Sequence, residues 1–190
     1  MKKLIIFISG RGSNMKRIIE ETKNGILKGV AEVVLVFSDK PEAPGLEIAE
    51  NMGIKTESLS SKGFKRKEYD EKVSEIIEKY PFDLIILAGY MRILSPEFVR
   101  KYPKKIINIH PADTKRHQGL DAYKWAFENR LPETKITVHY VDEGMDTGEI
   151  IAQKTVDLTG CKTLKEVEQR GLAVEHKLYS EVIKKLAEEL

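Results

Sequence analysis

The chain has 190 residues, of which 41% are hydrophobic and 33% are charged. A chain of this length suits one domain and buries roughly 70% of its unfolded surface, so a packed core is expected. Lys and Arg number 32 against 30 Asp and Glu. This near balance argues against a nucleic-acid-binding scaffold, which carries an excess of basic residues on one face.

The apolar segments and the cysteine content indicate the compartment. The apolar run at residues 4–8 ends at a Ser-Gly-Arg-Gly turn and is too short for a signal peptide. No run approaches the length that spans a bilayer. A single cysteine, Cys161, excludes an internal disulfide and a cysteine-based metal cluster. We therefore expect a cytoplasmic protein with no membrane partner.

Short runs rich in Val and Ile alternate with longer amphipathic stretches over the first two thirds of the chain. This alternation predicts parallel strands separated by crossover helices, and hence an α/β fold. The unbroken apolarity of the strands indicates burial on both faces of the sheet. The predicted strands are residues 4–8, 33–37, 55–57, 84–88 and 106–109, and the predicted helices are residues 14–22, 43–52, 66–79 and 120–128.

The alternation of predicted strands and helices ends after residue 128. Residues 135–141 and 149–156 are predicted to be strands joined by a loop too short to hold a crossover helix, so one of them is expected to be antiparallel. A final amphipathic helix is predicted over residues 163–187. Repeats and linkers are absent, and a single domain over residues 1–190 follows.

Residues 10–14 read Gly-Arg-Gly-Ser-Asn where the first strand turns into the first helix. Free backbone amides at such a helix N-terminus bind phosphate, although Ser13 and Asn14 are also good N-cap residues, and capping needs no ligand. Met15 stands where the dinucleotide fingerprint has its third glycine, and the Gly-Lys-Ser/Thr of a P-loop is missing. Asp39, after the second strand, leaves a nicotinamide-dependent enzyme as an alternative and an ordinary turn as another.

Residues 88–96 follow the fourth predicted strand, at the carboxyl edge where open α/β sheets bind ligands. Met91, Ile93 and Leu94 suit an apolar slot for a flat heteroaromatic group, and the backbone around Arg92 could read its polar edge. The alternative is a strand exit that packs into the core and caps the next helix with a Ser-Pro pair.

Asn108 and His110 lie at period two at the end of a predicted strand, so both side chains point to one side. An asparagine amide can hold a developing oxyanion, and a histidine can supply a proton near neutral pH. Asp146, in a later loop, would favour the charged imidazole. Two ordinary turns would explain the same residues without chemistry. The other histidines lack metal-ligand spacing and are predicted to be structural: His117, His139 and His176.

Four motifs, in their order and spacing, resemble the folate-dependent glycinamide ribonucleotide formyltransferases over nearly the whole chain: residues 9–14, 87–94, 108–111 and 141–148. The resemblance implies a three-layer α/β/α, Rossmann-like fold with a mostly parallel, seven-stranded mixed sheet. It also implies a phosphate-binding half over about residues 1–105 and a catalytic and folate-binding half over about residues 106–190.

The same resemblance implies transfer of the formyl group of 10-formyltetrahydrofolate to the amine of 5-phosphoribosyl-glycinamide, a step of purine synthesis that uses no metal. Its catalytic residues would be Asn108, His110 and Asp146. The acceptor's phosphate and ribose would contact Gly12, Ser13, Asn14 and Glu175. The folate would contact Arg66, Met91, Arg92, Ile93, Leu94, Asn108, Val141 and Asp142. A monomer or homodimer with small-molecule partners alone is expected.

Residues 112–118 depart from the family pattern, because Ala-Asp-Thr-Lys-Arg-His-Gln replaces a segment that usually holds Ser-Leu-Leu-Pro and an aromatic residue. The acceptor or water access can therefore differ. The alternatives are a related formyltransferase acting on an aminoacyl-tRNA or an amino sugar, a formyl-folate hydrolase, and a non-catalytic folate- or nucleotide-binding module. The lack of an appended domain argues against the tRNA enzyme and the hydrolase, and the retained Asn108, His110 and Asp146 argue against the binding module.

Overall fold

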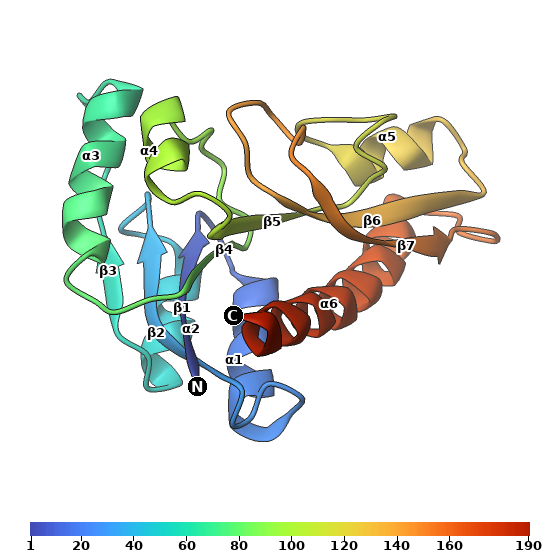
Figure 1. Ribbon diagram of the computed structural model, residues 1–190. Helices are drawn as coiled ribbons and strands as arrows, with labels where there is room; N and C mark the ends of the chain where they lie inside the picture. Colours follow the sequence, from blue (N-terminus) through green and yellow to red (C-terminus); the bar gives the residue numbers. More distant parts are fainter.

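The computed structural model describes all 190 residues, and it has one seven-stranded sheet between layers of helices (Figure 1). The strand order is β3-β2-β1-β4-β5-β6-β7. The strands are β1 (Lys2–Ile8), β2 (Ala31–Ser38), β3 (Thr56–Ser58), β4 (Leu84–Leu87), β5 (Ile106–His110), β6 (Glu133–Tyr140) and β7 (Ile150–Asp157). The helices are α1 (Ser13–Asn24), α2 (Pro44–Asn51), α3 (Arg66–Ile77), α4 (Pro96–Lys101), α5 (Ala122–Glu128) and α6 (Leu164–Glu189).

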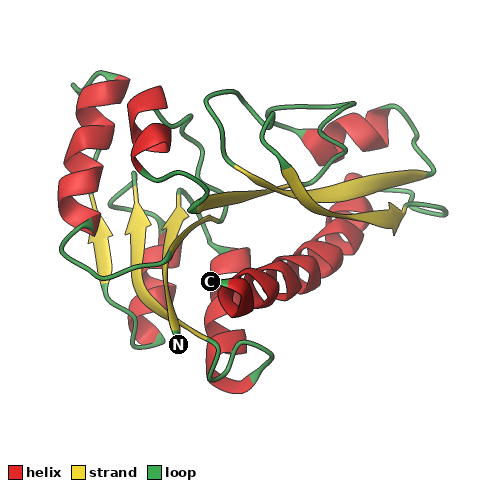
Figure 2. Cartoon of the chain, viewed as in Figure 1, coloured by secondary structure: helices red, strands yellow, loops and turns green.

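The sheet is mixed because one strand is reversed. Strands β1 to β5 pair with their neighbours in parallel, whereas β6 pairs antiparallel with both β5 and β7. The α/β class, the seven-stranded mixed sheet and the single antiparallel strand are thus confirmed. Figure 2 shows β5 to β7 crossing the view at a steep angle to β1 to β3, so the sheet is strongly twisted.

Both faces of the sheet are covered, which explains the unbroken apolar strands. Leu4, Ile6 and Ile8 of β1 pack in the core under α1, α2 and α6, while Ile5 and Phe7 pack in a second core with α3 and α4. All five side chains are fully buried. Each contributes about 1.5–3 kcal/mol to folding by leaving water, so a polar residue at any of these positions would be costly.

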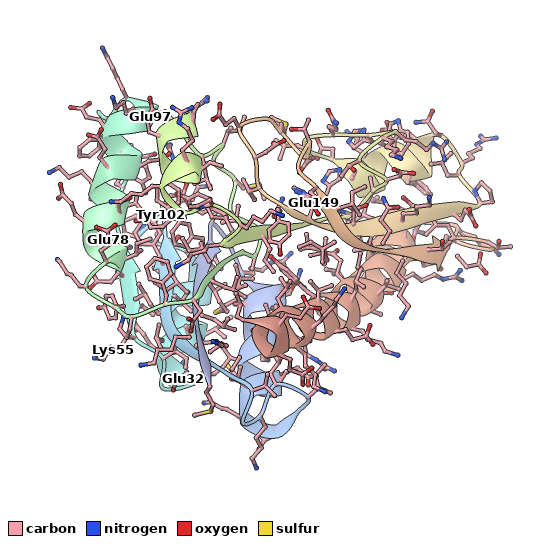
Figure 3. All side chains as sticks on the ribbon, viewed as in Figure 1. Glu32, Lys55, Glu78, Glu97, Tyr102 and Glu149 are labelled. Atoms are coloured by element: carbon pink, nitrogen blue, oxygen red, sulfur yellow. The ribbon has the colours of Figure 1, made fainter.

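Helix α4 corresponds to the alternative considered for residues 88–96, in which a Ser-Pro pair caps the next helix. Ser95 is its N-cap, with the side-chain oxygen accepting a hydrogen bond from the amide of Phe98 at 3.2 Å, and Pro96 occupies the first helical position. The helix is joined to α3 where the hydroxyl of Tyr102 donates to Glu78 at 2.8 Å (Figure 3).

The strand order reverses between β1 and β4, whose carboxyl ends therefore open a crevice. The connections that leave these two ends are residues 9–12 and residues 88–95, which carry the two ligand motifs expected from the sequence. No helix combines the length and apolarity that a bilayer crossing requires.

Candidate active site

Asn108 and His110 project from one face of β5, as their spacing predicts, because their neighbours Ile107 and Ile109 belong to the core on the opposite face. The antiparallel register sets His139 of β6 directly opposite Asn108. His110 is 4% exposed and His139 is 2% exposed. The strand pair therefore presents an amide and two imidazoles side by side in a nearly dry environment.

Asp146 reaches these side chains from the loop between β6 and β7. Its oxygen Oδ1 lies 3.4 Å from Nδ2 of Asn108 and 3.3 Å from Nε2 of His139. The other oxygen, Oδ2, lies 3.3 Å from Nδ1 of His110 and accepts a hydrogen bond of 2.9 Å from the amide of Gly119. The structure thus brings the three predicted catalytic residues together and adds His139.

Asp146 is held with a φ of 55°, in the left-handed region that only glycine adopts freely. A non-glycine residue in such a conformation costs on the order of 1–3 kcal/mol, and residues of this kind cluster at functional sites. The four contacts to its carboxylate over-determine this conformation.

Burial lowers the pKa of His110 below its ordinary value, and the nearby carboxylate of Asp146 opposes this shift only in part. The expectation that Asp146 favours the charged imidazole is right for that pair, but the net shift runs the other way because desolvation is larger. Burial also raises the pKa of Asp146, yet the adjacent imidazole of His139 and the hydrogen bond from the amide of Gly119 outweigh it and lower the pKa overall. The site therefore combines an ionised aspartate with a neutral His110 at neutral pH.

A cavity of about 400 Å³ opens beside these groups. Asn108, His110, His139 and Asp146 line it, and the predicted folate residues Met91, Arg92, Ile93, Leu94, Val141 and Asp142 line it as well. Met91 and Ile93 are 58% and 39% exposed, an unusual degree for large apolar side chains gathered in a hollow. Apolar walls with a few convergent polar groups are typical of a site for a flat, partly polar ligand.

Two of the predicted folate residues differ from the rest. Arg66 begins α3 on the exposed surface and is absent from the cavity wall. Arg92 lines the cavity, but its guanidinium group lies 4.3 Å from the centre of the Tyr69 ring, a cation–π contact that engages the side chain. The buried Nε atom of Arg92 has no hydrogen-bond partner.

The turn at residues 10–14 forms a second cluster of unpartnered groups. Gly12, with a φ of 70°, is the N-cap of α1, and no side chain caps this helix. The capping role considered for Ser13 and Asn14 is therefore wrong, because both lie inside the helix. The first amides of a helix have no partner within it, so those of Ser13, Asn14 and Met15 are available to an anion.

Asn14 and Glu175 meet at this turn although 161 residues separate them in the sequence. The amide nitrogen of Asn14 donates to Oε1 of Glu175 at 3.1 Å, and the hydroxyl of Tyr123 donates to Oε2. Asn14 is 7% exposed and its Oδ1 atom has no hydrogen-bond partner. Burial raises the pKa of Glu175. A buried acceptor without a donor points to a ligand that supplies one.

Asp39 has a structural partner instead of a ribose. Its carboxylate accepts a hydrogen bond of 2.6 Å from the hydroxyl of Ser9, and the same hydroxyl oxygen accepts one of 2.8 Å from the amide of Met91. This chain of bonds ties the turn after β1 to the connection after β4. The nicotinamide alternative loses its ribose ligand, because Asp39 is 6% exposed and already bonded.

The sequence did not single out His139, because a lone histidine within a strand is usually structural and only the register with β5 sets it against Asn108. The same holds for Gly119 and Tyr123, whose partners lie far away in the sequence. No group of three or more His, Cys, Asp and Glu side chains is arranged to hold a metal ion.

Comparisons with known proteins cover almost the whole chain. A family model described as formyl transferase matches residues 2–183. A phosphoribosylglycinamide formyltransferase from Bacillus subtilis is 41% identical over 187 residues, which are 98% of this chain and 95% of that protein. One from Escherichia coli is 37% identical over 181 residues, covering 95% of this chain and 84% of that protein.

A solved structure extends the likeness to three dimensions. The crystal structure of glycinamide ribonucleotide transformylase 1 from Symbiobacterium toebii is 33% identical and superposes with a TM-score of 0.93, covering all of this chain and 89% of that one. The sheet, its reversed strand and the covering helices are thus a shared architecture.

Proposed function

The chain belongs to the formyl transferase family, and on that premise we propose that Asn108, His110 and Asp146 transfer a formyl group from 10-formyltetrahydrofolate to a phosphorylated glycinamide. The activity itself is that of a phosphoribosylglycinamide formyltransferase of purine biosynthesis. The observation that supports the residue assignment is the convergence of three groups on the wall of the cavity: the amide of Asn108 lies 3.4 Å and the imidazole of His110 lies 3.3 Å from the carboxylate of Asp146.

The acceptor is 5-phosphoribosyl-glycinamide, bound at the turn after β1. Its phosphate contacts Gly12, Ser13 and Asn14 at the start of α1, because a helix N-terminus favours negative charge. Glu175 accepts hydrogen bonds from the ribose hydroxyls, and the unpartnered Oδ1 of Asn14 offers a further acceptor. The glycinamide chain then extends toward β5, with its amine at Asn108 and His110.

The donor is 10-formyltetrahydrofolate, with its pterin in the cavity. Met91, Ile93, Leu94 and Val141 enclose the ring, while Asp142 and the backbone of Arg92 contact its polar edge. The tail leaves through the open side of the cavity, and its expected contact is Arg66, at the exposed start of α3. We expect no metal, no nucleic acid and no membrane in this function. The location is the cytoplasm, and a monomer or homodimer suffices.

In the reaction, the acceptor amine attacks the formyl carbon and forms a C–N bond, and the carbonyl oxygen becomes an oxyanion. The amide of Asn108 donates to that oxygen, and His110 adds positive charge as it takes up the proton lost by the amine. Asp146 orders a water molecule that relays this proton and stabilises the imidazolium ion. The bond from the carbon to the folate nitrogen then breaks, and His110 returns the proton to that nitrogen. No covalent enzyme intermediate forms.

The test is release of tetrahydrofolate from 10-formyltetrahydrofolate, followed with and without 5-phosphoribosyl-glycinamide in the wild type and in His110→Ala. We expect turnover that depends on the acceptor and falls by at least about 10²-fold in the variant, the scale of a lost acid–base group. Turnover without the acceptor would point to a hydrolase. Folate binding without any turnover would point to a different amine or to a binding module.

A further inference from the structure

His117 lies in the segment that departs from the family pattern, and it contacts His110 twice. Its carbonyl oxygen is 2.9 Å from Nε2 of His110. Its ring lies parallel to that of His110, with an interplanar angle of 9° and 6.1 Å between the centroids. One residue therefore meets the catalytic imidazole through both its backbone and its side chain.

The ring of His117 is fixed on its other side as well. It stacks on Trp125 of α5 with centroids 4.8 Å apart and an interplanar angle of 19°. Its Nε2 atom donates to the carbonyl oxygen of Leu120 at 2.9 Å. The ring is thus held between a tryptophan and the catalytic histidine, and the carbonyl of the same residue is held with it.

The hydrogen bond of 2.9 Å to the carbonyl oxygen of His117 favours hydrogen on Nε2 of His110, whereas Nδ1 faces a second oxygen that only accepts, Oδ2 of Asp146, at the longer distance of 3.3 Å. A neutral imidazole has one N–H, so hydrogen on Nε2 leaves Nδ1 of His110 unprotonated. The next proton is then added at Nδ1, beside the carboxylate that stabilises the resulting charge.

We propose that His117 is a positioning residue that fixes neutral His110 with its hydrogen on Nε2, so that Nδ1 is the nitrogen that takes up and returns the proton during formyl transfer. This inference rests on the proposed function of His110. His117 acts through His110 and contacts no reacting atom.

The surroundings support a role for the whole segment. The amide of Gly119, two residues further on, donates to the same Oδ2 atom of Asp146 at 2.9 Å. The segment thus holds both partners of the proton transfer. The charged and titratable groups that face His110 are Asp146, His139 and His117, and the guanidinium carbon of Arg116 lies 5.8 Å from the centre of the Trp125 ring.

The tautomer can be observed directly by long-range ¹H–¹⁵N NMR of protein labelled at histidine. The chain has four histidines, so His110→Ala identifies the signals of the catalytic ring. In the wild type we expect Nε2 of neutral His110 to carry hydrogen. His117→Ala removes the stack and should give a mixture of tautomers, whereas His117→Phe keeps a stacking ring and should retain the wild-type pattern.

Kinetics provide the second readout. His117→Ala should lower kcat by about tenfold, the scale at which groups that orient a functional imidazole act, with the KM values of both substrates nearly unchanged. His117→Phe should recover most of that loss. Lys115→Ala alters an exposed side chain of the same segment, and it should leave both kcat and the tautomer as in the wild type.

The proposal fails if His110 keeps hydrogen on Nε2 in folded His117→Ala protein, or if the wild type carries it on Nδ1. It also fails if Lys115→Ala changes the tautomer as much as His117→Ala does. These NMR results do not depend on activity. Acceptor-dependent turnover that survives in His110→Ala would instead overturn the proposed function and leave the tautomer assignment intact.

Discussion

The turn after β1 and the cluster around Asp146, which we propose to bind the two ends of one substrate, are built differently. The turn consists of consecutive residues, and its groups are backbone amides placed by the start of α1. The cluster consists of side chains from β5, β6 and the loop after β6, joined at one carboxylate. The first site therefore depends on local conformation, and the second depends on strand register and burial.

The electrostatics of the two regions differ as well. Asp146 has a lowered pKa because donors surround it, whereas Glu175, beside the turn, has a raised pKa because burial outweighs its two hydrogen bonds. The difference teaches that burial alone does not set the charge state of a carboxyl group. The balance between desolvation and the donors that distant segments supply decides it.

The largest loss of activity is expected from a substitution of Asp146, whose carboxylate has four contacts in the cluster. Asp146→Asn should lower kcat by about 10³-fold, because it removes the charge that stabilises protonated His110 and orders the relay water. Steady-state kinetics at saturating substrates measure this. Asp157→Asn changes an exposed carboxylate at the end of β7 that only accepts a hydrogen bond from Thr159, and it should retain the wild-type rate. A loss below tenfold in Asp146→Asn would remove the proton-relay role.

Asn108→Ala tests the same cluster at the residue that we propose as the oxyanion donor. We expect kcat to fall by about 10²-fold or more, the cost of deleting one such donor, with little change in the KM for the acceptor. Thermal unfolding should be followed in parallel, since Asn108 also donates to Asp146 at 3.4 Å. A near-normal rate in a folded variant would show that the oxyanion is held elsewhere.

Gly12→Ala tests the turn. An added Cβ would lie 2.8 Å from Cε of Met15, at a φ of +70° that strains any residue with a side chain, so the end of the Met15 side chain must move and we expect the amides of the turn to lose their alignment. The KM for 5-phosphoribosyl-glycinamide should rise about tenfold, which corresponds to roughly 1.4 kcal/mol of binding, with kcat nearly unchanged. Gly29→Ala is the matched control, because Gly29 has a φ of +77° with open space around it. It should cost stability but leave KM unaltered.

The smallest change is expected for Glu175→Gln, which should raise the melting temperature while it weakens binding of the acceptor. Burial raises the pKa of Glu175 above its ordinary value of 4.5, so the folded protein favours the protonated acid. Glu175 contributes its full stabilisation of the folded state at pH values below 4.5. This contribution is lost as the pH rises through the pKa of the folded state. A glutamine is neutral throughout, so the variant should melt at a higher temperature than the wild type near neutral pH.

Measurement of the melting temperature against pH checks the sign. The advantage of Glu175→Gln should shrink as the pH falls toward and below 4.5, because the wild-type acid is then protonated in both states. The variant should meanwhile bind the acceptor less well, since it offers one fewer strong acceptor to the ribose. A wild type that is more stable than the variant near neutral pH would contradict the raised pKa.

Much of this protein follows from its sequence. The apolar runs determine the strands and their burial on both faces, since only a sheet covered by helices on each side can hide side chains that point both ways. The spacing of Asn108 and His110 determines that they share a face. The glycines at residues 10–12 determine a tight turn at a helix start. The division into halves at about residue 105 stays a prediction.

Only the tertiary structure decided which distant groups meet. The register of β6 brings His139 opposite Asn108, the loop after β6 folds back so that Asp146 reaches both strands, and α6 delivers Glu175 to Asn14. Burial then lowers the pKa of His110 and raises that of Glu175. A sequence pattern reports the conformation of neighbouring residues, whereas desolvation and charge pairing depend on every segment that packs against a group.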